Sequence, residues 1–160
     1  MKTVLGLACL LLAGCATAPR APFAPAPARE GAATVYFFRP PEMTAALRSP
    51  TISANGQVLG KVGYDAYGVA YLPPGETSFR SQWTGIPGGS RDDSASLDLT
   101  AGESYYLRVR FQAGKSRRAA PGAGVADALV FEDRPGLEQV PAAEAVPQMN
   151  GMSRVEPFGP

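Results

Sequence analysis

Cys15 is the residue whose type and surroundings most directly indicate chemistry. Its sulfur can act as a nucleophile and carry a covalent group, and it directly follows the small pair Ala13-Gly14. Upstream lie the positively charged start Met1-Lys2 and an apolar run over residues 4–12, which is too short to span a bilayer. A positive start, a short apolar run and small residues before a cleavage point are the parts of an export signal. We therefore expect the chain to be exported and cut before Cys15.

The motif Leu12-Ala13-Gly14-Cys15 resembles the lipobox of bacterial lipoprotein signal peptides, in which an aliphatic residue and two small residues precede a cysteine. The resemblance covers residues 1–15 and implies a signal peptide over residues 1–14 and a lipid group on the sulfur of Cys15. Ala16 stands where many inner-membrane lipoproteins carry aspartate, which implies the periplasmic face of the outer membrane. The alternatives are an ordinary secretory signal with an incidental cysteine and a loosely packed first helix. The flanking residues favour the lipobox.

The acidic residues are candidates for metal ligands and for catalytic groups. Asp92-Asp93 follow a Gly-rich stretch, and hard cations bind loop carboxylates. Their spacing matches no calcium loop that we can name, so a solvated turn is favoured. Hydrolysis of a glycoside would need two acids across a cleft, whereas nearly every acid here falls at an expected turn, strand end or tail. The exception, Asp98, is expected on the surface near Arg108.

The composition excludes several kinds of catalytic site. The chain has no histidine, so by itself it cannot build a Ser-His-Asp or Cys-His centre. Cys9 leaves with the signal peptide, so we expect no disulfide and no usual Cys/His zinc site. The net charge of +1 falls to zero when Lys2 is removed, so the chain lacks the basic surface of a nucleic-acid-binding protein. We expect no catalytic residue, metal, cofactor or nucleic-acid partner.

Tyr106, Arg108 and Arg110 alternate along one expected strand and share its outward face. Tyrosine and arginine are favoured at the centres of binding surfaces, so these three residues form a candidate interaction patch. The alternative is an ordinary polar sheet face, which is more common.

Three other tyrosines, Tyr64, Tyr67 and Tyr71, could stack on sugar rings if they were exposed. Tyr67 and Tyr71 share a face with Val69, which favours a place in the core.

Residues 15–31 form the stretch that joins the anchor to the rest of the chain. They are rich in Ala and Pro and show no apolar periodicity, which predicts a disordered, lipidated linker without a recognition role. Fully extended, at about 3.1 Å per residue, it would hold the domain about 50 Å from the membrane.

Alternation of apolar and polar residues predicts the strands. Thr34–Arg39 is apolar on both faces, which indicates a strand covered on two sides. Asn55-Gly56 is a strong hairpin signal, and a two-residue loop there would place Ile52 opposite Leu59. Further strands are expected over residues 67–72, 77–83, 95–99, 105–112 and 127–132, with the pattern broken over 85–93.

The turn over residues 100–103 predicts a second hairpin. Only a register that pairs inward residues with inward residues keeps both apolar rows in the core. It would place Leu97 opposite Leu107 and Leu99 opposite Tyr105, with Asp98 beside Tyr106 on the outer face.

The C-terminal part shows weaker signals. Residues 112–124 are basic and Gly-rich, which predicts a long loop. Residues 135–145 could form a short helix, although Pro141 opposes it. We expect the domain to cover residues 32–145, with a disordered tail over 146–160.

Short strands separated by turns, without a sustained helical pattern, predict an all-β fold, namely an antiparallel β-sandwich of about seven to eight strands. Four segments in this order also resemble the bacterial family called domain of unknown function 2846. They are Val35-Tyr36-Phe37-Phe38-Arg39-Pro40, Asn55-Gly56, Leu72-Pro73-Pro74-Gly75 and Ala101-Gly102-Glu103-Ser104-Tyr105-Tyr106-Leu107. The resemblance would cover about residues 32 to 145 and implies a lipoprotein-type β domain without an assigned activity.

The functional expectation is a lipid-anchored, non-enzymatic interaction or accessory module of the cell envelope, with a membrane anchor and a protein or glycan partner. The alternative is a glycan-binding or hydrolase-like protein that uses tyrosines and loop acids. A cleft that gathers two or more of those acids would favour the alternative. The acids are Asp92, Asp93, Glu103, Asp127 and Glu132.

Overall fold

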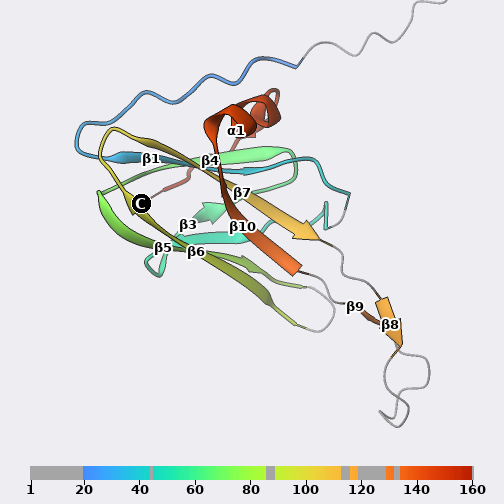
Figure 1. The fold of residues 1–160 in the computed structure, drawn as a ribbon. Helices are drawn as coiled ribbons and strands as arrows, with labels where there is room; N and C mark the ends of the chain where they lie inside the picture. The colour runs from blue at the N-terminus through green and yellow to red at the C-terminus, as the bar shows by residue number, and fades with distance from the viewer. Residues whose placement is uncertain are drawn as a thin grey trace, which may run out of the picture.

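The computed structural model describes residues 20–43, 45–85, 89–112, 116–118, 129–131 and 134–159. Two sheets pack face to face (Figure 1), which confirms the expected all-β sandwich. Cys15, Asp127 and Glu132 lie outside the described residues.

The five-stranded sheet has the order β10-β7-β1-β4-β11. Its strands are β10 (Arg134–Val140), β7 (Ser104–Gln112), β1 (Ala33–Arg39), β4 (Ala66–Leu72) and β11 (Ser153–Arg154). The pairs β1–β7 and β4–β11 are parallel, so this sheet is mixed rather than wholly antiparallel as expected.

The four-stranded sheet is antiparallel and has the order β3-β2-β5-β6. Its strands are β3 (Gln57–Lys61), β2 (Thr51–Ala54), β5 (Gly75–Trp83) and β6 (Arg91–Leu99). A separate pair, β8 (Ser116–Arg118) with β9 (Leu129–Phe131), extends from the sandwich as an arm (Figure 1). The loop expected over residues 112–124 therefore contains a strand.

The main core lies between the two sheets and contains large side chains from both, among them Phe37, Phe79, Trp83 and Leu107. A second apolar cluster lies on the other side of the five-stranded sheet, where Tyr36 and Phe38 meet the helix α1 (Ala142–Met149). Every residue of β1 is buried as a result. This confirms the expectation that the first strand is covered on two sides.

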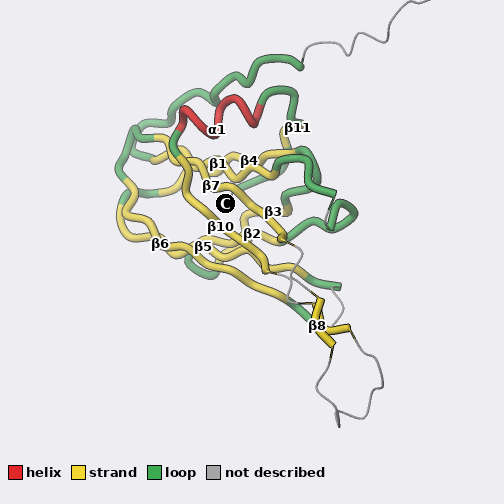
Figure 2. Tube along the Cα trace, turned by 45° about the vertical axis from the view of Figure 1, so that its right-hand side comes forward, coloured by secondary structure: helices red, strands yellow, loops and turns green. Residues whose placement is uncertain are grey.

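Residues 20–31, here called the N-terminal segment, lie along the outer side of the five-stranded sheet together with α1 (Figures 1 and 2). The Phe23 ring packs edge-on against Tyr36 and Tyr67, with centroids 5.5 and 5.4 Å away. The backbone N–H of Ala26 donates to the Tyr36 hydroxyl at 2.9 Å, and the Tyr71 hydroxyl donates to the Pro27 carbonyl at 3.0 Å. The predicted disordered linker is therefore wrong for these residues, because one aromatic anchor and several backbone groups dock them.

The helix expected over residues 135–145 is also wrong. Residues 134–140 form β10, which pairs with β7, and α1 begins only after Pro141. β10 is an edge strand, where a proline such as Pro135 is tolerated. Its buried residues Leu137 and Val140 have a spacing that fits a helix as well, which explains the error.

The C-terminal residues belong to the domain, contrary to the expected free tail. β11 adds to β4, and the Gly159 N–H donates to the Leu59 carbonyl at 2.9 Å. The Phe158 ring lies against Gly60 of one sheet and Gly68 of the other, where a Cβ atom would stand 2.5 and 2.4 Å from ring atoms. The absence of side chains at these two glycines thus leaves space for the Phe158 ring between the sheets.

The first expected hairpin forms, with positive φ at Asn55 (47°) and Gly56 (82°). Its predicted register is wrong: Ile52 faces Gly60 instead of Leu59, because the pairing shifts between Ile52 and Ser53. The irregularity lets Leu59 point into the core, where it is buried.

The second expected hairpin does not form. β6 pairs with β5, and β7 pairs with β1 and β10 in the other sheet, so residues 100–103 cross between the sheets. Leu97 consequently faces Thr77 instead of Leu107, and Asp98 faces Glu76 instead of Tyr106. Parity fixes which side of a strand is buried, but it does not fix the partner strand.

Candidate interaction surface

The predicted patch of Tyr106, Arg108 and Arg110 lies on the outer side of β7, as parity predicted, but it is covered. Tyr106 is 7% exposed and stacks on Tyr36 with ring centroids 4.9 Å apart. Burial raises the pKa of both tyrosine hydroxyls. Tyr106 is therefore part of the second apolar cluster, and the prediction of an exposed contact patch is wrong.

Arg108 holds α1 on the sheet. Its guanidinium donates to Glu138 of β10 at 2.8 Å and to Glu144 of α1 at 2.5 Å, and its side chain is only 14% exposed. Burial lowers the pKa of Arg108, but the hydrogen bonds to the two carboxylates outweigh that effect and raise it. Arg110 pairs with Glu42 at 3.5 Å and with Glu138 at 3.6 Å. Through these ion pairs Arg108 and Arg110 connect β7 to β10, to α1 and to Glu42, so their charges are used inside the domain.

The tyrosines considered for sugar stacking are mostly occupied by the protein itself. Tyr67 and Tyr71 pack with Val69 in the second cluster, as expected. The Arg29 guanidinium lies 3.9 Å from the centroid of the Tyr71 ring. Tyr64, in the loop between β3 and β4, is 43% exposed.

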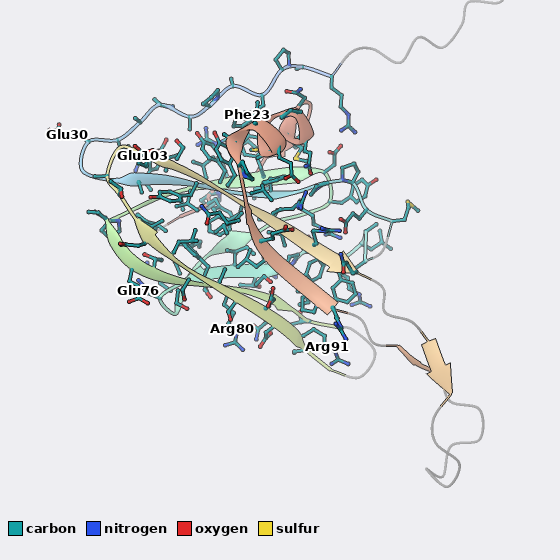
Figure 3. All side chains as sticks on the ribbon, viewed as in Figure 1. Phe23, Glu30, Glu76, Arg80, Arg91 and Glu103 are labelled. Carbon is teal, nitrogen blue, oxygen red and sulfur yellow. The ribbon has the colours of Figure 1, made fainter. Side chains whose placement is uncertain are left out.

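The acids do not gather in a cleft in the described part of the chain. Asp92 and Asp93 lie within β6, not in the expected turn. Asp92 pairs with Arg80 of β5, and Asp93 accepts a hydrogen bond from the Leu137 N–H across the sheets at 2.7 Å. Glu103 follows the other end of β6, far from Arg91 at its start (Figure 3). Among the described residues no group of three potential metal ligands lies together.

The outer side of the four-stranded sheet differs from that of the other sheet, because no described helix or segment lies over it (Figures 1 and 2). We call this side the open face. It contains a shallow hollow of about 350 Å³. The hollow is lined by Thr51, Ser53, Gly56, Val58, Ser78, Arg80 and Gln82.

Strand alternation produces the open face. In β5, Phe79, Ser81 and Trp83 point into the core, so Ser78, Arg80 and Gln82 point outward. Thr51 and Ser53 of the neighbouring strand β2 are small, and the hollow lies beside them. Val58 is 62% exposed beside it and adds an apolar contact. Hydroxyl, amide and guanidinium groups on one surface suit the recognition of a polar partner.

Acidic groups occupy the other end of the open face. Glu76 of β5 lies directly opposite Asp98 of β6, and both are exposed. They line a second hollow of about 270 Å³ together with Ser96 and Leu97. Like charges in facing positions oppose sheet formation, so this pair is a local cost that a cationic partner would relieve.

The strand expected over residues 77–83 implies by its alternation that Ser78, Arg80 and Gln82 share one face. It did not reveal that this row remains uncovered, because that depends on where the N-terminal segment and α1 dock. Whether a sheet face is covered depends on long-range packing, and the alternation of residues along one strand carries no information about that packing.

Comparison with known proteins gives one match. The family model described as "Protein of unknown function (DUF2846)" matches residues 29–123, which span β1 to β8. No curated protein and no solved structure matches the chain. Within the described residues, α1 is the one helix, and it has neither the length nor the apolar character to cross a bilayer.

Proposed function

The chain belongs to the DUF2846 family of proteins of unknown function, and from that premise we propose that it is a lipid-anchored cell-envelope protein that acts without catalysis, as an interaction module. The family description assigns no activity, so the proposal rests on the residues of this chain. Cys15 would carry the anchor, and the open face would bind the partner.

The anchor is supported by the sequence Leu12-Ala13-Gly14-Cys15 behind a short apolar run. A thioether-linked diacylglyceryl group, with about 0.8 kcal/mol for each buried CH₂, holds a protein stably at a bilayer. Because Ala16 stands where many inner-membrane lipoproteins carry aspartate, the proposed location is the periplasmic face of the outer membrane.

The open face is the observation that supports an interaction role. The opposite side of the sandwich is covered by α1 and the N-terminal segment, whereas the outward groups of β2, β3 and β5 border a hollow. The side chains there are donors and acceptors, which suits a polar protein surface of the envelope.

A hydrolase is less well supported. Asp92 and Asp93 are engaged by Arg80 and by the Leu137 N–H, and Glu103 lies at the other end of β6. General acid–base catalysis requires acids that converge on one substrate position. A glycan that binds at the open face remains the second candidate partner, because its hydroxyl groups match the same donors and acceptors.

The anchor is tested by labelling cells with palmitate. We expect the wild-type chain to incorporate label and to remain with the membrane fraction, and the Cys15→Ala variant to incorporate none. Equal labelling of the two proteins would refute the lipid anchor.

The open face is tested by photo-crosslinking in intact cells. A photoreactive amino acid at Ser78 should give a discrete adduct, whereas the same group at the exposed Ala143 of α1, on the opposite side, should not. A protein adduct supports the first candidate, and an adduct sensitive to glycan-degrading enzymes supports the second. Equal adducts from the two positions would show that the open face has no special role.

A further inference from the structure

Two large apolar side chains stand almost free in solvent at one end of the sandwich. Met43 is 87% exposed and Leu47 is fully exposed, at 102%, in the loop between β1 and β2. Single exposed apolar residues are ordinary at protein surfaces. These two differ because the loop that displays them is held by a buried charge.

Arg39, at the end of β1, supplies that charge. Its side chain is completely buried, and its guanidinium lies 4.8 Å from the centroid of the Trp83 ring. It donates to the Ala45 carbonyl at 2.7 Å and to the Arg48 carbonyl, on either side of Leu47. Burial of an arginine is costly without such hydrogen bonds. These hydrogen bonds therefore hold the backbone on either side of Leu47 in a conformation that exposes the Leu47 side chain to solvent.

The same end of the sandwich receives the start of the N-terminal segment. Arg39 pairs with Ala66 in the sheet, so the loop after β1 and the loop before β4 emerge together. Asp65, in the second of these loops, accepts a hydrogen bond from Arg20 at 3.1 Å. The partly exposed Tyr64 is its neighbour. In Figure 1 the blue N-terminal segment runs from the left, where β1 begins, to the right-hand side.

The length of chain before Arg20 limits how far this end can be from the anchor. Cys15 and Arg20 are five positions apart in the chain, and at about 3.6 Å for each position they lie at most about 18 Å from one another. A domain of this size has a radius of gyration of about 14 Å. The remaining connection is thus about as long as that radius, so an anchored domain stays beside the membrane with its Arg20 end toward it.

We propose that Met43 and Leu47, with Tyr64 of the adjoining loop, contact the lipid surface and dock this end of the domain on the membrane that holds the anchor. The inference rests on the proposed lipidation of Cys15. Leucine and methionine enter the boundary between headgroups and acyl chains, and tyrosine prefers that interface. A loop held by Arg39 loses little conformational freedom on docking, which favours the contact.

A polarity-sensitive fluorophore tests the contact in the lipidated protein. Cleavage removes Cys9 and lipidation blocks the Cys15 thiol, so Leu47→Cys introduces a single free thiol for labelling. The labelled protein is placed in vesicles of phosphatidylethanolamine and phosphatidylglycerol. We expect a blue-shifted emission at position 47 and quenching by lipids that carry a nitroxide on the acyl chain. Val58→Cys, at another exposed apolar position on the open face, is the matched control and should emit as in water.

The outcomes separate this inference from the proposed function. Water-like emission at both positions in a protein that floats with the vesicles would overturn the docking and leave the anchor intact. A protein that is not lipidated and does not float would overturn both proposals. A blue shift at position 47 without quenching by lipid nitroxides would show another occupant, such as a protein, and would also overturn the lipid contact.

Discussion

Arg39 shows how one buried residue connects the core to the surface. Its guanidinium contacts the Trp83 ring of the core and two carbonyls of the surface loop, so it stabilises both the core and the loop. Burial lowers its pKa, the effect of moving a charge away from water. The sequence gives no sign of this role, because an arginine at a strand end usually faces solvent.

We predict that Arg39→Met destabilises the protein by about 2 kcal/mol, because the carbonyls of Ala45 and Arg48 lose their donor. Arg39→Lys should cost less, since an ammonium can still donate to one of them. Urea unfolding gives the free energies, and limited proteolysis should cut the loop over residues 41–48 faster in Arg39→Met. An unchanged midpoint for that variant would contradict the role of the guanidinium.

Gly68 lies directly against the Phe158 ring. A methyl group there would meet the Phe158 ring at 2.4 Å, so Gly68→Ala should displace the ring and cost about 1–3 kcal/mol. In a Phe158→Ala background the same change should cost much less. Thermal unfolding of the four proteins in this cycle gives the coupling. Strict additivity would mean that the ring does not occupy the space above Gly68.

The elements differ in how well local patterns predicted them. β5 and β7 were predicted almost to their ends, because the residue types along both strands alternate between two faces of different polarity. β10 was mistaken for a helix because Leu137 and Val140 fit either periodicity. α1 and β11 carry little local signal, because α1 packs on the outer side and β11 pairs at the edge of a sheet assembled from distant parts of the chain.

The ion pair between Arg108 of β7 and Glu138 of β10 predicts that stability depends on pH. The hydrogen bond from Arg108 is the main cause that lowers the pKa of Glu138 below its ordinary value of 4.5. A carboxyl with a depressed pKa in the folded state stabilises it fully above pH 4.5, and this contribution is lost as the pH falls through the depressed value. Glu138 is 51% exposed, so the contribution is at most about 1 kcal/mol.

Stability measured from pH 6 to pH 2 checks this prediction. Glu138→Gln should lose less stability than the wild-type protein over that range. In an Arg108→Gln background the Glu138 substitution should change the slope less, and only through the remaining pair with Arg110. An equal acid dependence of the Glu138→Gln variant and the wild type would exclude this ion pair as a source of pH dependence.

For the whole molecule, the sandwich class followed from short strands and frequent turns, but the boundaries of the domain did not. Both ends were predicted to be disordered because Pro-rich segments without periodicity usually are. Here Phe23 and Phe158 dock these segments, one outside the five-stranded sheet and one between the sheets. A single aromatic residue in a segment gives no periodic signal, so its docking site becomes visible only in the assembled fold. The open face was missed for the same reason.

A chain that begins at residue 32 should be less stable than one that begins at residue 20, by at least about 2 kcal/mol. The shorter chain loses the contacts of the partly buried Phe23 ring and the hydrogen bonds with Tyr36 and Tyr71. It should also bind a hydrophobic dye more strongly, because the second apolar cluster is uncovered. Phe23→Ala in the longer chain should reproduce part of the effect. Equal melting temperatures would show that the N-terminal segment contributes nothing to stability.

The docking of the N-terminal segment also sets an order of events in time. The Phe23 N–H donates to the Asn150 side chain at 2.8 Å, and the Gly151 N–H donates to the Ala21 carbonyl at 2.8 Å. Asn150 is synthesised 127 positions after its partner Phe23. β1, the first strand, also waits for β7, which lies about seventy positions later, and such distant pairing is slow. The N-terminal segment therefore emerges long before its docking partners and is immobilised only after them, which leaves it accessible throughout that interval.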